Sequence, residues 1–155
     1  MSKSLKRVRA ALIAAGMPDT IRETGAATTA QMAADAIGCA VDQIAKSIMF
    51  QAETSGDCVL FITAGGNQVD AGKAQALVGE PLGKADAAAI RAQTGFAIGG
   101  VSPVGHLTAP RAFFDPRLLD FTEIWAAAGT PRHVFSAVPQ ILMRISNAQL
   151  SDFTA

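Results

Sequence analysis

Eight consecutive residues, Gly99-Gly100-Val101-Ser102-Pro103-Val104-Gly105-His106, form the stretch of this sequence best suited to hold a ligand. Its three glycines permit positive φ angles and let the main chain approach a ligand closely, and the proline fixes the backbone locally. Its side chains offer one hydroxyl and one imidazole, without a carboxylate or a thiol. We therefore expect backbone N–H groups to be the chemical resource of this loop.

A lysine within a predicted strand is the second candidate. In the β-rich segment 44–50, alternation places Ile44, Lys46, Ile48 and Phe50 on one face. A cation on an otherwise apolar face is costly to desolvate unless it reaches the edge of the sheet or meets an anion. Lys46 is therefore either a structural lysine whose head group reaches solvent or a cation that binds a ligand.

Side-chain nucleophiles and metal ligands are poorly represented. Ser102 lies outside any Gly-x-Ser-x-Gly motif, so a serine-hydrolase elbow is absent. Cys39 and Cys58 are far apart with no CxxC, which disfavours a disulfide framework and a zinc cluster. The only histidines, His106 and His133, have no carboxylates at metal-ligand spacing, so we expect no metal. His106 is left with two interpretations, a ligand contact or a surface imidazole bonded to backbone.

A strand lysine, a loop rich in N–H groups and no protein nucleophile together suit an anionic or esterified ligand. Backbone donors can stabilise the oxyanion that forms when an ester carbonyl is attacked, while a lysine holds a nearby phosphate. The attacking group would then come from water or from the substrate itself. This combination predicts ester hydrolysis without a covalent enzyme intermediate.

Length and charge limit the alternatives. The 155 residues predict a single domain over 1–155. Thirteen basic residues balance thirteen acidic ones, which argues against extensive phosphate contacts with DNA or with the body of an RNA. The sequence shows neither a membrane span nor a secretory signal, so we expect a cytoplasmic protein without a membrane partner.

The periodicity predicts elements that alternate along the chain and indicates an α/β or α+β fold with several strands in one mixed sheet. Capping residues and glycine stops delimit the helices. Helices are predicted over 4–15, 28–38, 70–78, 85–94 and 139–145, and strands over 21–24, 44–50, 58–63, 113–115, 122–127 and 133–137. The polar turn 53–57 predicts a hairpin of strands 44–50 and 58–63, and strands 122–127 and 133–137 are expected to pair.

At the lysine strand and the glycine loop the sequence resembles the YbaK/proline-tRNA-synthetase-associated editing-domain family. The matching features are the lysine strand 44–50, the Gly-x-x-x-Pro loop 99–105 and the preceding helix at 28–38, and the resemblance runs from about 7 to 150. It implies a mixed, partly barrel-like β-sheet flanked by helices. It also implies that the aminoacyl ester lies between Lys46 and the loop.

The resemblance assigns roles to individual residues. Lys46 would contact the phosphate or ribose of the 3′-terminal nucleotide, and Gly99 and Gly100 would polarise the ester carbonyl through backbone N–H groups. Val101, Ser102, Pro103 and His106 are the expected substrate-binding residues. No metal or organic cofactor is implied.

The function that follows is a trans-acting aminoacyl-tRNA deacylase. Its expected substrate is mischarged tRNA, with tRNA(Pro) carrying Cys, Ala or another small amino acid favoured. The acceptor end of the tRNA is the expected partner, and a need for an aminoacyl-tRNA synthetase stays open. Two alternatives also stay open: a non-catalytic module that binds a tRNA end or a small molecule, and a hydrolase for another activated acyl ester.

Overall fold

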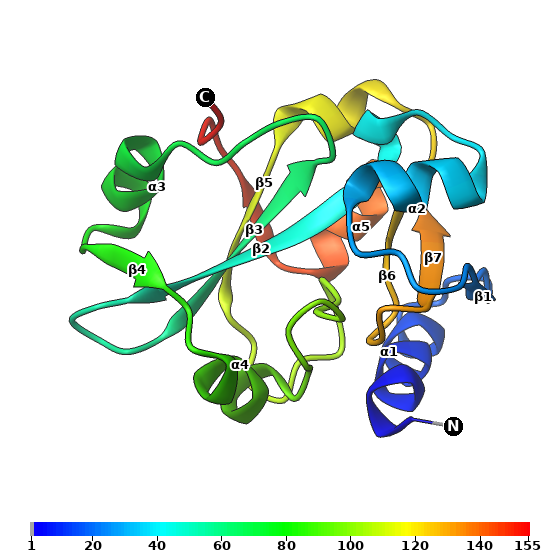
Figure 1. Cartoon of the computed structure of the whole chain (residues 1–155), viewed down its shortest axis with the longest axis horizontal. Helices are drawn as coiled ribbons and strands as arrows, with labels where there is room; N and C mark the ends of the chain where they lie inside the picture. The colour runs from blue at the N-terminus through cyan, green and yellow to red at the C-terminus, as the bar shows by residue number, and fades with distance from the viewer. Residues whose placement is uncertain (1) are drawn as a thin grey trace.

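The computed structural model describes residues 2–155 and alternates helices with strands along the chain (Figure 1). The helices are α1 (Lys3–Ala14), α2 (Ala30–Ile37), α3 (Ala71–Val78), α4 (Ala87–Thr94) and α5 (Pro139–Ile145), with 3-10 turns η1 (Val41–Gln43) and η2 (Pro116–Asp120). The strands are β1 (Arg22–Glu23), β2 (Ala45–Ala52), β3 (Cys58–Ala64), β4 (Leu82–Lys84), β5 (Arg111–Phe114), β6 (Ile124–Ala127), β7 (His133–Ala137) and β8 (Ala148–Leu150).

A five-stranded mixed sheet in the order β4-β2-β3-β5-β8 forms the body of the fold. The β2–β3 hairpin is antiparallel and pairs Lys46 with Thr63, whereas β3–β5 and β5–β8 are parallel. Every residue of β3 is buried because both faces of this central strand are covered. The predicted hairpin is confirmed, and it fixes Lys46 on a rigid element.

A second sheet, in the order β1-β7-β6, lies beside the first and corrects the expectation of one mixed sheet. A single parallel bridge between Ile44 and Trp125 connects the start of β2 to β6. The mixed α/β class is confirmed, but the partly barrel-like closure implied by the resemblance is not. The β6–β7 pair, antiparallel as predicted, instead stands against one end of β2.

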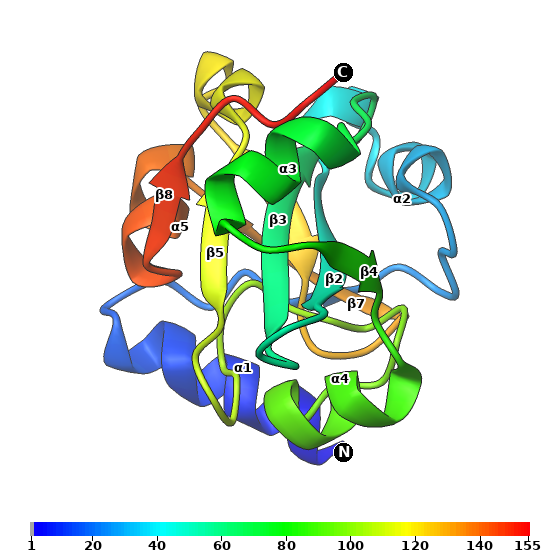
Figure 2. The same ribbon diagram turned by 90° about the vertical axis from the view of Figure 1, so that its left-hand side faces the viewer.

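The two faces of the five-stranded sheet have different covers. Figure 2 shows α3 lying across one face, where Phe61 stacks on Phe113 with ring centroids 5.2 Å apart. The opposite face packs Leu60 and Ile62 against α1 and the second sheet in the largest core cluster. Alternate residues of β3 therefore supply two separate cores.

Local signals in the sequence explain most helix boundaries. Asp70 and Asp86 cap α3 and α4 through their carboxylates, and Thr29 caps α2 through its hydroxyl. The short strands β4 and β8, three residues each, were not predicted. No helix within residues 2–155 is long and apolar enough to cross a bilayer.

Candidate functional site

A cavity of about 820 Å³ lies along one edge of β2. Helix α2 and the segment before it form one side, and the β6–β7 pair with its connecting turn forms another. Gly99 and Val101 of the glycine loop close a third side, and Lys46 lies in the wall supplied by β2. The lysine and the first part of the loop thus meet at one cavity, as the sequence predicts.

The β2 edge is open at the cavity for a topological reason. On the edge of β2 that faces away from β3, strand β4 pairs only with Phe50–Ala52. Strand β6 forms only the single bridge between Trp125 and Ile44. Among the described strands, none pairs with residues 45–49 on this side. Residues that point to opposite faces of the sheet both line the cavity in this segment, so the strand edge itself, with its backbone and side chains, is accessible to a ligand.

Lys46 is half-buried, and its ammonium is held by main chain instead of by an acid. Its Nζ donates a hydrogen bond to the carbonyl oxygen of Gly65 at 3.2 Å. Burial lowers the pKa of Lys46, and the nearby charges of Asp42 and Asp115 act in the opposite direction. Within residues 2–155 the ammonium has no ion-pair partner. It is therefore free to meet an anionic group.

The glycine loop presents main chain to the cavity, but only in its first part. The N–H groups of Gly99 and Val101 donate no hydrogen bond to any acceptor within residues 2–155. The N–H of Gly100 is already used, because it donates to the Ala97 carbonyl at 3.0 Å. Gly99 adopts a φ of 89°, a conformation that favours glycine. Gly99 and Val101 therefore border the cavity with N–H groups that no internal acceptor uses, unlike the N–H of Gly100.

Gly100 has a packing role instead. A Cβ at this position would lie 3.0 Å from Cα of Thr130, in the turn between β6 and β7. Glycine thus allows the loop to approach that turn closely. In this structure the N–H of Gly100 is engaged by Ala97 and its Cα side faces the backbone of Thr130, while its expected ligand contact stays a prediction.

Ser102, Pro103 and His106 lie outside the cavity lining. Ser102 is fully buried, and its hydroxyl accepts a hydrogen bond from the N–H of Val104. The Nε2–H of His106 donates to the Ser102 carbonyl at 2.6 Å, and its ring meets Phe96 edge to face. Burial lowers the pKa of His106, with Arg7 acting the same way and the Ser102 hydrogen bond opposing. The second half of the loop is an internal anchor.

Arg7 holds this anchor from α1. Its Nε donates to the Gly105 carbonyl and one terminal nitrogen donates to the Gly95 carbonyl, each at 3.0 Å. Its guanidinium also lies 4.9 Å from the centre of the Phe96 ring. The basic N-terminal helix therefore contributes a structural clamp at Arg7, which its sequence alone does not distinguish from a solvated face.

Several cavity residues come from segments that sequence reasoning did not bring to the site. His133 lines the cavity, and its Nδ1 lies 2.7 Å from the Thr130 hydroxyl. Trp125 and Lys84 also line the cavity. Ser47 lines it too, and its buried hydroxyl has no hydrogen-bond partner among residues 2–155. Their positions depend on strand pairings between distant parts of the chain. The rarity of histidine in the sequence was the one available signal for His133.

Thiols and metal ligands do not gather at the cavity. Cys39 and Cys58 are absent from its lining, and burial raises the pKa of both thiols. Within residues 2–155, no three His, Cys, Asp or Glu side chains cluster as metal ligands would. The donors at the cavity include two ammonium groups (Lys46 and Lys84), amide N–H groups, hydroxyls and one imidazole, which suit phosphate, ribose and ester oxygens.

Comparison with known proteins places this site in a family. YwhH, an uncharacterized protein of Bacillus subtilis (strain 168), is 34% identical over 125 residues, covering 80% of this chain and 78% of its own. A candidate trans-editing enzyme for prolyl-tRNA synthetase, known from a crystal structure, is 45% identical with a TM-score of 0.91, covering 100% of this chain and 99% of its own. A hypothetical protein at 21% identity, with a TM-score of 0.86 and coverage of 96% and 99%, shares the fold. The sequence model of the aminoacyl-tRNA editing domain matches residues 24–145, and the chain belongs to that family.

Proposed function

We propose that this protein is a trans-acting deacylase that hydrolyses the ester of mischarged tRNA, with tRNA(Pro) carrying Cys, Ala or another small amino acid as substrate. The observation that carries the proposal is the meeting of the Lys46 ammonium with Gly99 and Val101 at one cavity. Membership of the editing-domain family supports an editing role. The similarity to a candidate trans-editing enzyme for prolyl-tRNA synthetase favours tRNA(Pro).

In the proposed reaction, Lys46 binds a phosphate or ribose oxygen of the terminal nucleotide and thereby orients the ester. The N–H groups of Gly99 and Val101 then stabilise the oxyanion that forms as the carbonyl is attacked. Water or a group of the substrate supplies the nucleophile, and the ribose hydroxyl leaves as the C–O ester bond breaks. Gly100 sets the approach of the loop to the β6–β7 turn, whereas Ser102, Pro103 and His106 stabilise its buried second half.

The partner in this proposal is the acceptor end of the tRNA. A cavity of this size accommodates a terminal nucleoside with a small amino acid but not a helical stem. Because basic and acidic residues balance, the chain has few excess positive charges to bind the phosphates of the tRNA body. A synthetase partner could therefore supply the selectivity for one tRNA.

A deacylation panel tests the proposal. Elongator tRNA(Pro) charged separately with Cys, Ala, Ser, Thr and Pro is incubated with catalytic amounts of protein, and released amino acid is measured over several turnovers. Rapid hydrolysis of at least one noncognate ester, with Pro-tRNA(Pro) spared, is expected. Saturable binding without turnover would instead support a non-catalytic module. Turnover of simple acyl esters without inhibition by uncharged tRNA would support a general acyl hydrolase.

A further inference from the structure

The ammonium of Lys46 is positioned by a tight turn at the end of β3, residues 64–67. The turn closes with a hydrogen bond from the N–H of Asn67 to the carbonyl of Ala64 at 2.9 Å. Between them, the carbonyl of Gly65 accepts the bond from Lys46 Nζ. The location of the ammonium therefore depends on what fixes this turn.

Two carboxylates fix the turn from outside the cavity. Asp42 in η1 accepts a hydrogen bond from the N–H of Gly66 at 2.8 Å. Asp115, which precedes η2, accepts from the N–H of Ala64 at 3.0 Å and from the Asn67 side chain at 2.9 Å. Consecutive segments of the turn are thus bound by charged acceptors, which make stronger hydrogen bonds than neutral ones.

Arg117 joins the two carboxylates into one network. Its Nε donates to the second oxygen of Asp42 at 3.0 Å, and its backbone N–H donates to the second oxygen of Asp115 at 3.0 Å. Both oxygens of each acid are therefore engaged. Neither acid forms an ion pair with Lys46 among the described residues, although both act on its pKa.

The turn is pressed against η1 too tightly for any residue but glycine. An added Cβ at Gly65 would collide with the Val41 carbonyl oxygen, and one at Gly66 would collide with the Asp42 carboxylate. Because the fit is this close, the position of η1 and the position of the Gly65 carbonyl are coupled, and the hydrogen bond from Gly66 to Asp42 is the polar link between them.

We propose that Asp42 is a positioning residue for Lys46: it holds the turn that anchors the ammonium and leaves the remaining ammonium N–H groups to the ligand. The inference rests on the proposed role of Lys46 in binding the charged tRNA end. An acid in direct contact with the ammonium would compete with the ligand phosphate, whereas Asp42 acts through the Gly66 amide and the Gly65 carbonyl.

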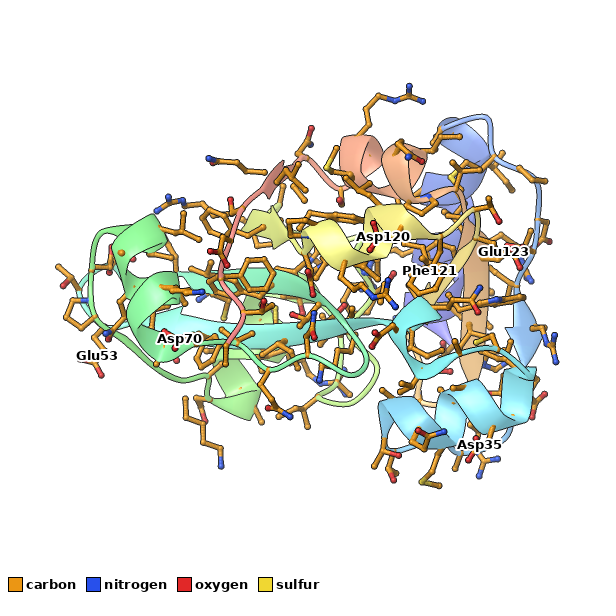
Figure 3. The ribbon with its side chains drawn as sticks, turned by 90° about the horizontal axis from the view of Figure 1, so that it is seen from above. Asp35, Glu53, Asp70, Asp120, Phe121 and Glu123 are labelled. Atoms are coloured by element: carbon orange, nitrogen blue, oxygen red, sulfur yellow. The ribbon has the colours of Figure 1, made fainter. Side chains whose placement is uncertain are left out.

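Two variants distinguish the hydrogen bond that Asp42 accepts from the negative charge that it carries. Asp42→Asn retains an oxygen that can accept from Gly66 but loses the charge, and Asp42→Ala loses both. Asp120→Asn is the matched control. Asp120 also pairs with Arg117, at 2.9 Å, but it lies on η2 (Figure 3), and no hydrogen bond or ion pair joins it to residues 64–67.

Deacylation of mischarged tRNA(Pro) is measured for all three variants across pH, after subtraction of spontaneous hydrolysis. Asp42→Ala is expected to lower kcat/KM about tenfold, and Asp42→Asn to remain within about threefold near neutral pH. The alkaline limb of the Asp42→Asn profile should move to lower pH, because a negative charge that raises the pKa of Lys46 is lost. Asp115, Lys84 and His133 are unchanged in these variants, so their charges do not produce the shift.

Direct titration of Lys46 separates this inference from the proposed function. The lysines are ¹³C-dimethylated, the Lys46 signal is assigned by its loss in Lys46→Arg, and its pKa is followed by NMR in parent and variants. A lower Lys46 pKa in Asp42→Asn, with Asp120→Asn unchanged, is expected whether or not the protein hydrolyses any tested ester. A folded Asp42→Ala variant with parental kinetics and an unmoved Lys46 titration would overturn the positioning role. Failure of the parent protein alone to turn over would count against the deacylase proposal only.

Discussion

The two walls of the cavity are built in opposite ways. On the β2 wall a side chain, Lys46, projects from a regular strand and is held by a hydrogen bond to the Gly65 carbonyl. On the loop wall, Gly99 and Val101 border the cavity and leave their N–H groups without an acceptor among residues 2–155, while Ser102 and His106 bond within the protein. One wall should therefore respond to side-chain removal, and the other to changes in backbone shape.

The largest effect is expected at Lys46. Lys46→Ala should lower kcat/KM for a mischarged tRNA by about 100-fold or more, because a charge-assisted contact to the substrate is lost. Thermal unfolding should be little changed, since the ammonium is only partly buried and has no ion pair among residues 2–155. Steady-state deacylation and a melting curve provide the measurements. Parental activity in a folded Lys46→Ala variant would remove the β2 wall from the mechanism.

A smaller but substantial loss is expected at Gly100. Gly100→Ala places a methyl group against the backbone of Thr130, so either the loop or the β6–β7 turn must shift. We expect destabilisation of about 1–3 kcal/mol and a fall in kcat/KM of about tenfold. Denaturant unfolding and deacylation rates measure the two effects.

Gly99→Ala is the comparison for that variant. Its Cβ would meet no atom within 4 Å, but the residue would keep a φ of 89° at a cost of about 1–2 kcal/mol. If both variants deacylate at the parental rate, the main chain of this loop does not touch the substrate.

The second half of the loop should affect stability without affecting chemistry. His106→Ala removes the hydrogen bond to the Ser102 carbonyl and the edge contact with Phe96. A loss of about 1–3 kcal/mol in unfolding free energy is expected, with kcat/KM within about twofold of the parent. The opposite outcome, lost activity at unchanged stability, would return His106 to the substrate-binding set.

The smallest expected effect is a pH dependence of stability due to His106. Because burial lowers its pKa in the folded protein, the unfolded chain binds this proton at higher pH. Stability should therefore fall as the pH drops through about 6.5 and level off below the folded pKa. Unfolding free energies measured between pH 5 and 8 should show a step that is missing in His106→Ala.

The sequence predicted the elements with strong local signals. The capped helices and the β2–β3 hairpin are present because their side-chain period and caps act over a few residues. The three-residue strands β4 and β8 carry no periodicity of their own and exist through pairing with β2 and β5. The division into two sheets likewise depends on long-range pairing.

The candidate site was predictable to a similar degree. Lys46 and Gly99 could be found because a cation in a strand and a cluster of glycines are unusual locally. The sequence could not separate Gly99 from Gly100, because only tertiary packing shows that one amide is engaged and the other is not. No local sequence pattern indicates the role of Asp42, because its partner Gly66 is remote in sequence and the contact forms only when the turn packs against η1.

The open edge of β2 has a consequence for how this protein can diversify. A strand within a sheet offers a ligand every second side chain, but five consecutive residues here, 45–49, border the cavity. Neighbouring positions with opposite orientation can therefore be exchanged separately, each altering a different part of the cavity wall. Under the proposed function, a short run of sequence could thereby retune which amino acid is accepted while the strand that carries the ammonium stays in place.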